Sequence, residues 1–137
     1  MNDTRTAPAE PYLYAVIRIV PDIERGERFN VGVVLFCRTR RFLAAQTRLH
    51  ADKLAALAPS QELDSVQEQL TAMERIAAGD VMSGPLARLD QAERFHWLVA
   101  PGSTIVQPSS VHTGLTEDPA ATLAHLFRRL VGASGDE

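Results

Sequence analysis

Residues 12–37, YLYAVIRIVPDIERGERFNVGVVLFC, decide the fold. Two apolar runs, 12–20 and 31–37, flank a polar connector and are rich in Val, Ile, Phe and Tyr, which favour strands. In the first run the odd positions are wholly apolar, whereas the even positions include Arg18. This alternation predicts a strand with one dry face and one mixed face.

The second run is apolar at every position except Gly32, which predicts a central strand covered on both sides. We expect Val31, Val33, Leu35 and Cys37 to share one face of this strand. The connector, residues 22–30, is too long for a tight hairpin, so we expect a loop there. A short turn then leads into residues 42–47, which predict a third strand antiparallel to the second.

The later sequence changes to helical spacing. It predicts a short helix before Pro59, a longer amphipathic helix closed by Gly79, and a short helix capped by Asp90. Residues 104–107 have the composition of a late strand. Asp118 followed by proline predicts the start of a C-terminal amphipathic helix.

This order of elements defines the expected fold class. We predict an α+β fold with a largely antiparallel sheet of three to five strands, the first three as a meander. Helices pack on the sheet, and the last is the C-terminal amphipathic helix. The 137 residues predict a single domain at 12–131, with disordered tails at 1–11 and 132–137.

Composition excludes several classes of protein. The net charge of −3 gives no overall field that attracts nucleic acid or an anionic membrane. The single cysteine, Cys37, cannot form an internal disulfide and is typical of a reducing compartment. No apolar stretch reaches the ~20 residues of a membrane span, and no signal core is seen. We therefore expect a cytoplasmic protein without membrane contact.

Catalytic and metal-binding patterns are weak in this sequence. The four histidines are widely separated, and no Cys or carboxylate stands at ligand spacing from them. Cys37 lies in an apolar strand, where a thiol is normally inert. The turn serines have no G-x-S-x-G motif around them. We therefore predict no catalytic residue, no metal and no cofactor, and lean away from an enzyme.

One set of polar residues stands out. Arg18 is the only charge in the first strand, where an unpaired guanidinium is costly, and Glu27 of the connector is its natural partner. Either these side chains form a small pocket for an anion or nucleotide, or the pair locks the loop while the other residues act as local caps. The candidate set is Arg18, Glu27, Asn30, His112 and Thr113.

A basic cluster gives a second candidate. No acidic residue occurs between residues 31 and 51, whereas four arginines do. They could hold a phosphate backbone or an acidic partner, or they could form a solvated hairpin tip that discourages edge pairing. Without an overall basic excess, nucleic-acid binding is the weaker interpretation. The four are Arg38, Arg40, Arg41 and Arg48.

Long strings in the sequence resemble a known family. They are YAVIRIVPD at 14–22, RGERFNVGVVL at 25–35, RFHWL at 94–98 and STIVQPSSVHTGL at 103–115. From Tyr12 to Val131 the chain resembles the bacterial family called domain of unknown function 3037. The resemblance implies a small single-domain protein without an established activity. It also implies an accessory role, because the family's genes often lie beside HipA-like kinase genes.

Three hypotheses follow from the sequence. The first is a non-catalytic binding or accessory protein that acts through a protein partner, with a HipA-like kinase as the candidate. The second is a small enzyme or a nucleotide- or anion-sensing domain that uses Arg18, Glu27, Asn30 and His112. The third is nucleic-acid binding through the Arg38–Arg48 hairpin.

Overall fold

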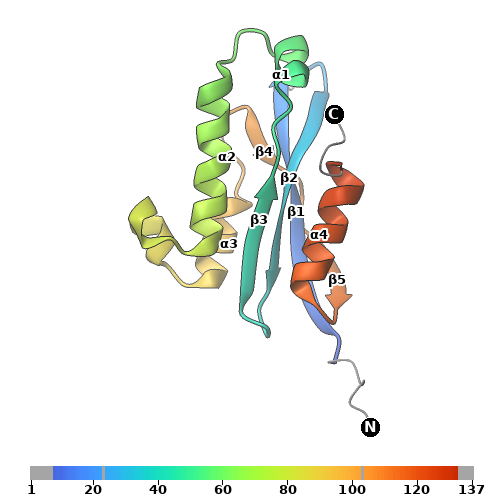
Figure 1. Cartoon of the computed structure of the whole chain (residues 1–137), viewed down its shortest axis with the longest axis vertical. Coiled ribbons are helices and arrows are strands. Elements are labelled where there is room, and N and C mark those ends of the chain that lie inside the picture. The colour runs from blue at the N-terminus through green and yellow to red at the C-terminus, as the bar shows by residue number, and fades with distance from the viewer. Residues whose placement is uncertain (1–7, 23, 103, 133–137) are drawn as a thin grey trace.

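The structure is a computed structural model that describes residues 8–22, 24–102 and 104–132. These residues form an antiparallel sheet with helices on both faces (Figure 1), which confirms the predicted α+β class. Of the predicted tails at 1–11 and 132–137, residues 1–7 and 133–137 lie outside the described residues. Residues 10 and 11, expected in the N-terminal tail, instead belong to the first strand.

The sheet is built on its first strand. The order is β3-β2-β1-β4, and β5 pairs with the same edge of β1 as β4, further along it. All of these pairings are antiparallel, and β1, β2 and β3 form the predicted meander. The strands are β1 (Glu10–Asp22), β2 (Glu27–Cys37), β3 (Phe42–Thr47), β4 (Val106–Pro108) and β5 (His112–Thr116).

The helices form two unequal layers. Three pack on one face of the sheet, and the last packs on the other (Figure 1). Two short 3-10 segments, η1 (Val81–Ser83) and η2 (Pro85–Arg88), connect the second helix to the third. The helices are α1 (Ala51–Leu57), α2 (Leu63–Ala78), α3 (Gln91–Leu98) and α4 (Pro119–Leu130).

Local end signals set the limits of the helices. Gly79 ends α2 with φ of 74°, a backbone conformation that glycine adopts without strain. The Asp90 carboxylate accepts a 2.9 Å bond from the Glu93 amide at the start of α3. Asp118 accepts likewise from the Ala121 amide at 3.2 Å in α4. All three ends were predicted from the sequence.

A bulge in β2 changes which side chains share a face. Ile17 of β1 lies opposite Gly32, whereas Arg18 lies opposite Asn30, so Val31 is an extra residue. Val31 consequently packs with Ile17 on the α1–α3 side, while Val33 packs under α4. The expectation that Val31 and Val33 share a face is wrong, because the inserted residue reverses the alternation.

The connector between β1 and β2 also differs from expectation. The predicted loop at 22–30 is largely strand, because β1 continues to Asp22 and β2 begins at Glu27. Residues 24–26 form the turn, and all three are exposed. The hairpin end is therefore a solvated ribbon, in which polar side chains do not oppose strand pairing.

Candidate functional site

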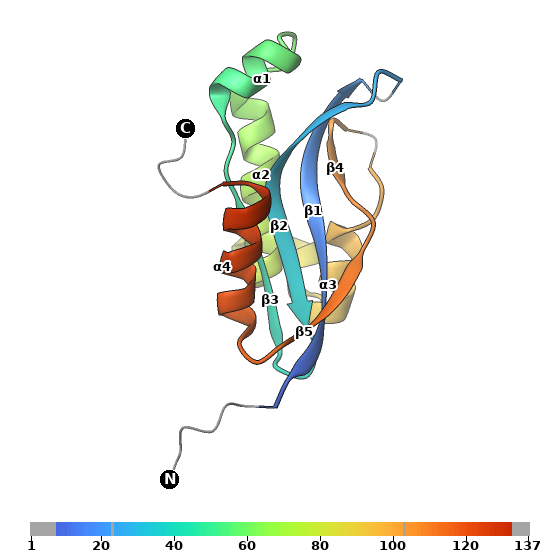
Figure 2. The same cartoon turned by 90° about the vertical axis from the view of Figure 1, so that its right-hand side faces the viewer.

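The face of the sheet that carries α4 has a covered half and an open half. Buried side chains of β2 pack against Leu123 and Leu126 of α4. Figure 2 shows α4 in front of β2 and β3, with no helix in front of β1, β4 and β5. We call this uncovered part the open face. Its side chains are Tyr12, Tyr14, Val16 and Arg18 of β1 with Asn30 of β2 and His112 of β5. Val16 is buried, and Tyr12 and Tyr14 are partly buried at the border with the α4 cluster, against which they pack.

Arg18 lies at one end of the open face, on the interior strand. Its cross-strand neighbours are Asn30 on β2 and Gln107 on β4, so polar side chains flank it on both sides. Asn30 donates from Nδ2 to the carbonyl of Leu130, 2.9 Å away, which ties the end of α4 to this part of the sheet. The structure thus brings Arg18 and Asn30 together, as the sequence suggested.

The expected ion pair between Arg18 and Glu27 does not form. Glu27 lies opposite Asp22, and its carboxylate is 2.9 Å from the Arg25 guanidinium. The reason is local: Arg25 lies two residues away across the turn, whereas Arg18 faces Asn30 further down the hairpin. Among the described residues, the Arg18 side chain has no hydrogen bond or ion pair.

Electrostatics at Arg18 reflect this missing partner. Burial lowers the pKa of its guanidinium below the usual value, and the charge of Arg28 lowers it further. Arg28 precedes Asn30 by two residues on β2 and is therefore the diagonal neighbour of Arg18. Two guanidiniums thus lie near one another at this end, which we call the cationic end.

The other end of the open face is aromatic. The Tyr14 and His112 rings have centroids 5.2 Å apart, and those of Tyr12 and Tyr14 are 6.0 Å apart. The Tyr12 ring also occupies the space above Gly114, where a Cβ atom would lie 2.6 Å from it. We call Tyr12, Tyr14 and His112 the aromatic end.

The two ends are separated along β1, so the predicted five-residue pocket is not formed. His112 pairs with Tyr14, four residues from Arg18, which corresponds to about 13 Å along a strand. Thr113 pairs with Leu13, whose side chain packs on the α1–α3 side. Arg18 and Asn30 are neighbours, His112 shares their face at a distance, and Glu27 and Thr113 lie elsewhere.

Ser109, which the sequence did not single out, joins the two edge strands to β1. The Val16 amide donates to its Oγ at 2.8 Å, and the Ser109 amide donates back to the Val16 carbonyl at 2.8 Å. The hydroxyl therefore replaces a ladder bond at the break between β4 and β5. No spacing rule in the sequence reveals this role, because it depends on the cross-strand register.

Three of the four arginines in the predicted basic cluster lie in the β2–β3 turn. Arg38 and Arg41 are exposed there. Arg40 donates to the backbone carbonyls of Glu117, at 2.9 Å, and Pro8, at 2.7 Å. Arg40 thus holds the start of β1 and the segment before α4 against the turn.

Arg48 lies apart from the other three. The six residues of β3 separate it from the turn, about 20 Å along a strand. Its guanidinium carbon lies 5.9 Å from the centre of the Phe127 ring of α4. The four arginines therefore do not form one patch, because a strand carries its two ends to opposite edges of the molecule.

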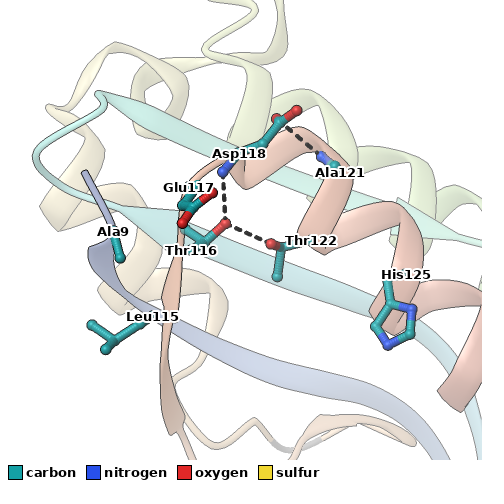
Figure 3. A pocket seen from close by; sticks show the side chains of 8 residues that line it. All are labelled: Ala9, Leu115, Thr116, Glu117, Asp118, Ala121, Thr122 and His125. Atoms are coloured by element: carbon teal, nitrogen blue, oxygen red, sulfur yellow. Dashed lines mark hydrogen bonds between the residues drawn. The ribbon is translucent and has the colours of Figure 1, made fainter. Parts of the chain in front are cut away.

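A pocket of about 400 Å³ lies beside the start of α4 (Figure 3). The Thr116 and Thr122 hydroxyls are 2.5 Å apart, and the Asp118 amide donates to Thr116 Oγ1 at 3.0 Å. These bonds complete the cap of the helix, so the two threonine hydroxyls and the Asp118 amide serve the fold. Its lining residues are Ala9, Leu115, Thr116, Glu117, Asp118, Ala121, Thr122 and His125.

The described residues, 8–22, 24–102 and 104–132, contain no group of three or more His, Cys, Asp or Glu side chains that could hold a metal ion. None of their helices has the length and apolar character that a membrane crossing requires.

Comparison with protein families identifies the chain. The model of the family described as "Protein of unknown function (DUF3037)" matches residues 14–131. The chain belongs to the DUF3037 family. The match runs from β1 to the end of α4 and confirms the resemblance found in the sequence. Beyond the DUF3037 match, comparisons with curated proteins and with solved structures find no significant similarity.

Proposed function

We propose that this DUF3037 chain is a non-catalytic binding protein that acts through a protein partner docked on the open face. The observation that carries the proposal is the position of α4, which packs on β2 and leaves β1, β4 and β5 without a helix in front of them on this face (Figure 2). Of the β1 side chains, Tyr12 and Tyr14 pack against the edge of the α4 cluster. The open face presents Tyr12, Tyr14 and Arg18, and tyrosine and arginine are enriched among residues that dominate protein interfaces.

The chemistry of the open face supports binding over catalysis. The imidazole ring of His112 contacts the Tyr14 ring and not a nucleophile. Cys37 is buried, and its thiol is 3.5 Å from the carbonyl of Pro11. A rigid antiparallel sheet with half-buried aromatic side chains is suited to bind a partner with little loss of side-chain entropy.

A HipA-like kinase is the first partner to test. The resemblance implies that genes of this family often lie beside such a kinase gene. We place the interaction in the cytoplasm, as expected from the sequence. An acidic surface on the kinase would complement the uncompensated Arg18.

The test uses the purified chain and the HipA-like kinase of the source genome. We expect a complex by size-exclusion chromatography with light scattering at micromolar concentrations. Tyr14→Asp should abolish it, because the substitution places a charge at the centre of the aromatic end. Met82→Asp is the matched control, since Met82 is 89% exposed on the side of α1–α3.

Two outcomes would overturn the proposal. One is the absence of any complex with the kinase. The other is a complex that survives Tyr14→Asp unchanged while both variants retain the melting temperature of the native chain.

A further inference from the structure

We propose that the cationic end of the open face is an oxyanion-binding site, in which Arg18 and Arg28 hold one carboxylate or phosphate group. The inference deepens the proposed function by naming the chemistry that the partner would present. It rests on the proposed function in one respect only: the docked partner is the molecule that carries the anionic group.

Neutral side chains flank Arg18, and their polar groups are engaged elsewhere. Gln107 donates to the carbonyls of Gly102, at 2.7 Å, and of Thr104, and accepts from the Gly102 amide at 3.3 Å. Asn30 donates to the end of α4. These two residues therefore hold a loop and a helix at either side of Arg18 and leave its guanidinium donors unused.

Two carboxylates of the hairpin are engaged at its turn. Asp22 Oδ1 accepts from the amides of Glu24, at 3.0 Å, and of Arg25, at 3.4 Å. Glu27 is paired with Arg25. Among the described residues, none of the acidic groups of this hairpin is bonded to Arg18 or Arg28.

Two guanidiniums without a counterion form a site prepared for an anion. As diagonal neighbours on adjacent strands, Arg18 and Arg28 have Cβ atoms within about 7–8 Å, so both side chains can reach one oxyanion. The guanidinium fork binds carboxylate and phosphate through paired bonds. Arg28 is exposed, which leaves the site open to solvent. The net charge of −3 excludes a general anion attraction by the whole chain.

The experiment follows the Nε–Hε signals of the arginines by NMR while sodium phosphate or sodium acetate is added. Sodium chloride at equal ionic strength is the screening control. We expect saturable shifts of the Arg18 and Arg28 signals with phosphate, acetate or both. A stronger response to acetate indicates an acidic peptide as the natural ligand, and a stronger response to phosphate indicates a phosphorylated one.

Variants separate a specific site from general screening. Arg18→Gln should abolish the saturable response at Arg28, whereas Arg38→Gln, at the exposed β2–β3 turn, should leave it unchanged. Arg18→Lys keeps the charge but removes the fork, and should weaken binding at least fivefold. Amide spectra that overlay with those of the native chain verify folding.

The inference is overturned if the shifts grow linearly and equally in all three salts, or if Arg18→Gln leaves the Arg28 response intact. Failure of the kinase complex with a saturable anion response would overturn only the proposed function. A complex without any anion response would overturn only the oxyanion site.

Discussion

The two halves of the α4 side of the sheet lie one strand apart and have opposite characters. In the covered half, Val33, Leu35 and Cys37 of β2 are fully buried. In the open half, Val16 of β1 is buried, but Tyr12, Tyr14 and Arg18 are only partly buried. Neighbouring strands are about 4.8 Å apart, so the position of one helix decides the environment of each strand. We infer that the covered half stabilises the fold and the open half is kept for binding.

The largest effect should come from the covered half. Leu126→Ala removes a buried side chain of α4 and leaves a cavity above β2, which should lower the free energy of unfolding by about 2–5 kcal/mol. Urea denaturation measures this. His125→Ala, one residue away on the exposed side of α4, should change it by less than about 0.5 kcal/mol. Equal effects would contradict the division into halves.

Alanine substitutions at two glycines, one in each half, compare how rigid the two halves are. An alanine Cβ at Gly32 would lie 2.8 Å from the Gln46 carbonyl oxygen, a backbone atom, so Gly32→Ala should cost about 1–3 kcal/mol. At Gly114 the obstacle is the end of the Tyr12 ring, a side chain that can shift more readily than a backbone carbonyl. Gly114→Ala should therefore cost less. Thermal denaturation of both variants tests the order, and the reverse order would show that the open half is as rigid as the covered one.

The hydrogen bonds of Ser109 join the segment between β4 and β5 to β1 in the open half. Ser109→Ala leaves the buried Val16 amide without its acceptor, which should cost about 1–2 kcal/mol in unfolding free energy. Ser110→Ala, at the exposed neighbouring position, is the control. Hydrogen exchange of the Val16 amide should accelerate in the first variant alone. An unchanged rate would mean that the hydroxyl bond does not protect this strand.

The smallest effect concerns alkaline pH. Burial, and to a lesser degree Tyr14, raises the pKa of Tyr12 above 10.0, so the folded state retains its proton after the unfolded state has lost it. This contribution to stability is present below pH 10 and is lost as the pH rises through the folded-state pKa. Tyr12→Phe should therefore show a shallower fall in unfolding free energy between pH 9 and 11. Identical slopes for the variant and the native chain would contradict the assignment.

Local signals made much of the fold predictable. Alternation in β1 and the apolar run of β2 identified the central strands, and Gly79, Asp90 and Asp118 marked helix ends correctly. Each of these signals is contained in a few consecutive residues. The family was likewise recognisable from contiguous strings of residues.

Features that depend on cross-strand register were not predictable. The sequence does not show that Val31 is an inserted residue or that Ser109 bonds to Val16, since each depends on a partner distant in the chain. β5 was missed because His112, Thr113 and Gly114 have the composition of a loop, which an edge strand tolerates. The candidate site was therefore only partly predicted: Arg18 and Asn30 converge, but Glu27 does not.

Whether Arg18 has a partner within the chain is tested most directly by a double-mutant cycle with Arg18→Gln and Glu27→Gln. The cycle is measured as free energies of unfolding in urea. We predict that Arg18→Gln leaves the stability unchanged or raises it by up to about 1 kcal/mol, because it removes a partly buried charge that has no partner. The coupling energy between the two substitutions should be close to zero. A loss of stability in both single variants, with a coupling energy above about 1 kcal/mol, would contradict the claim that Arg18 is kept for an external anion.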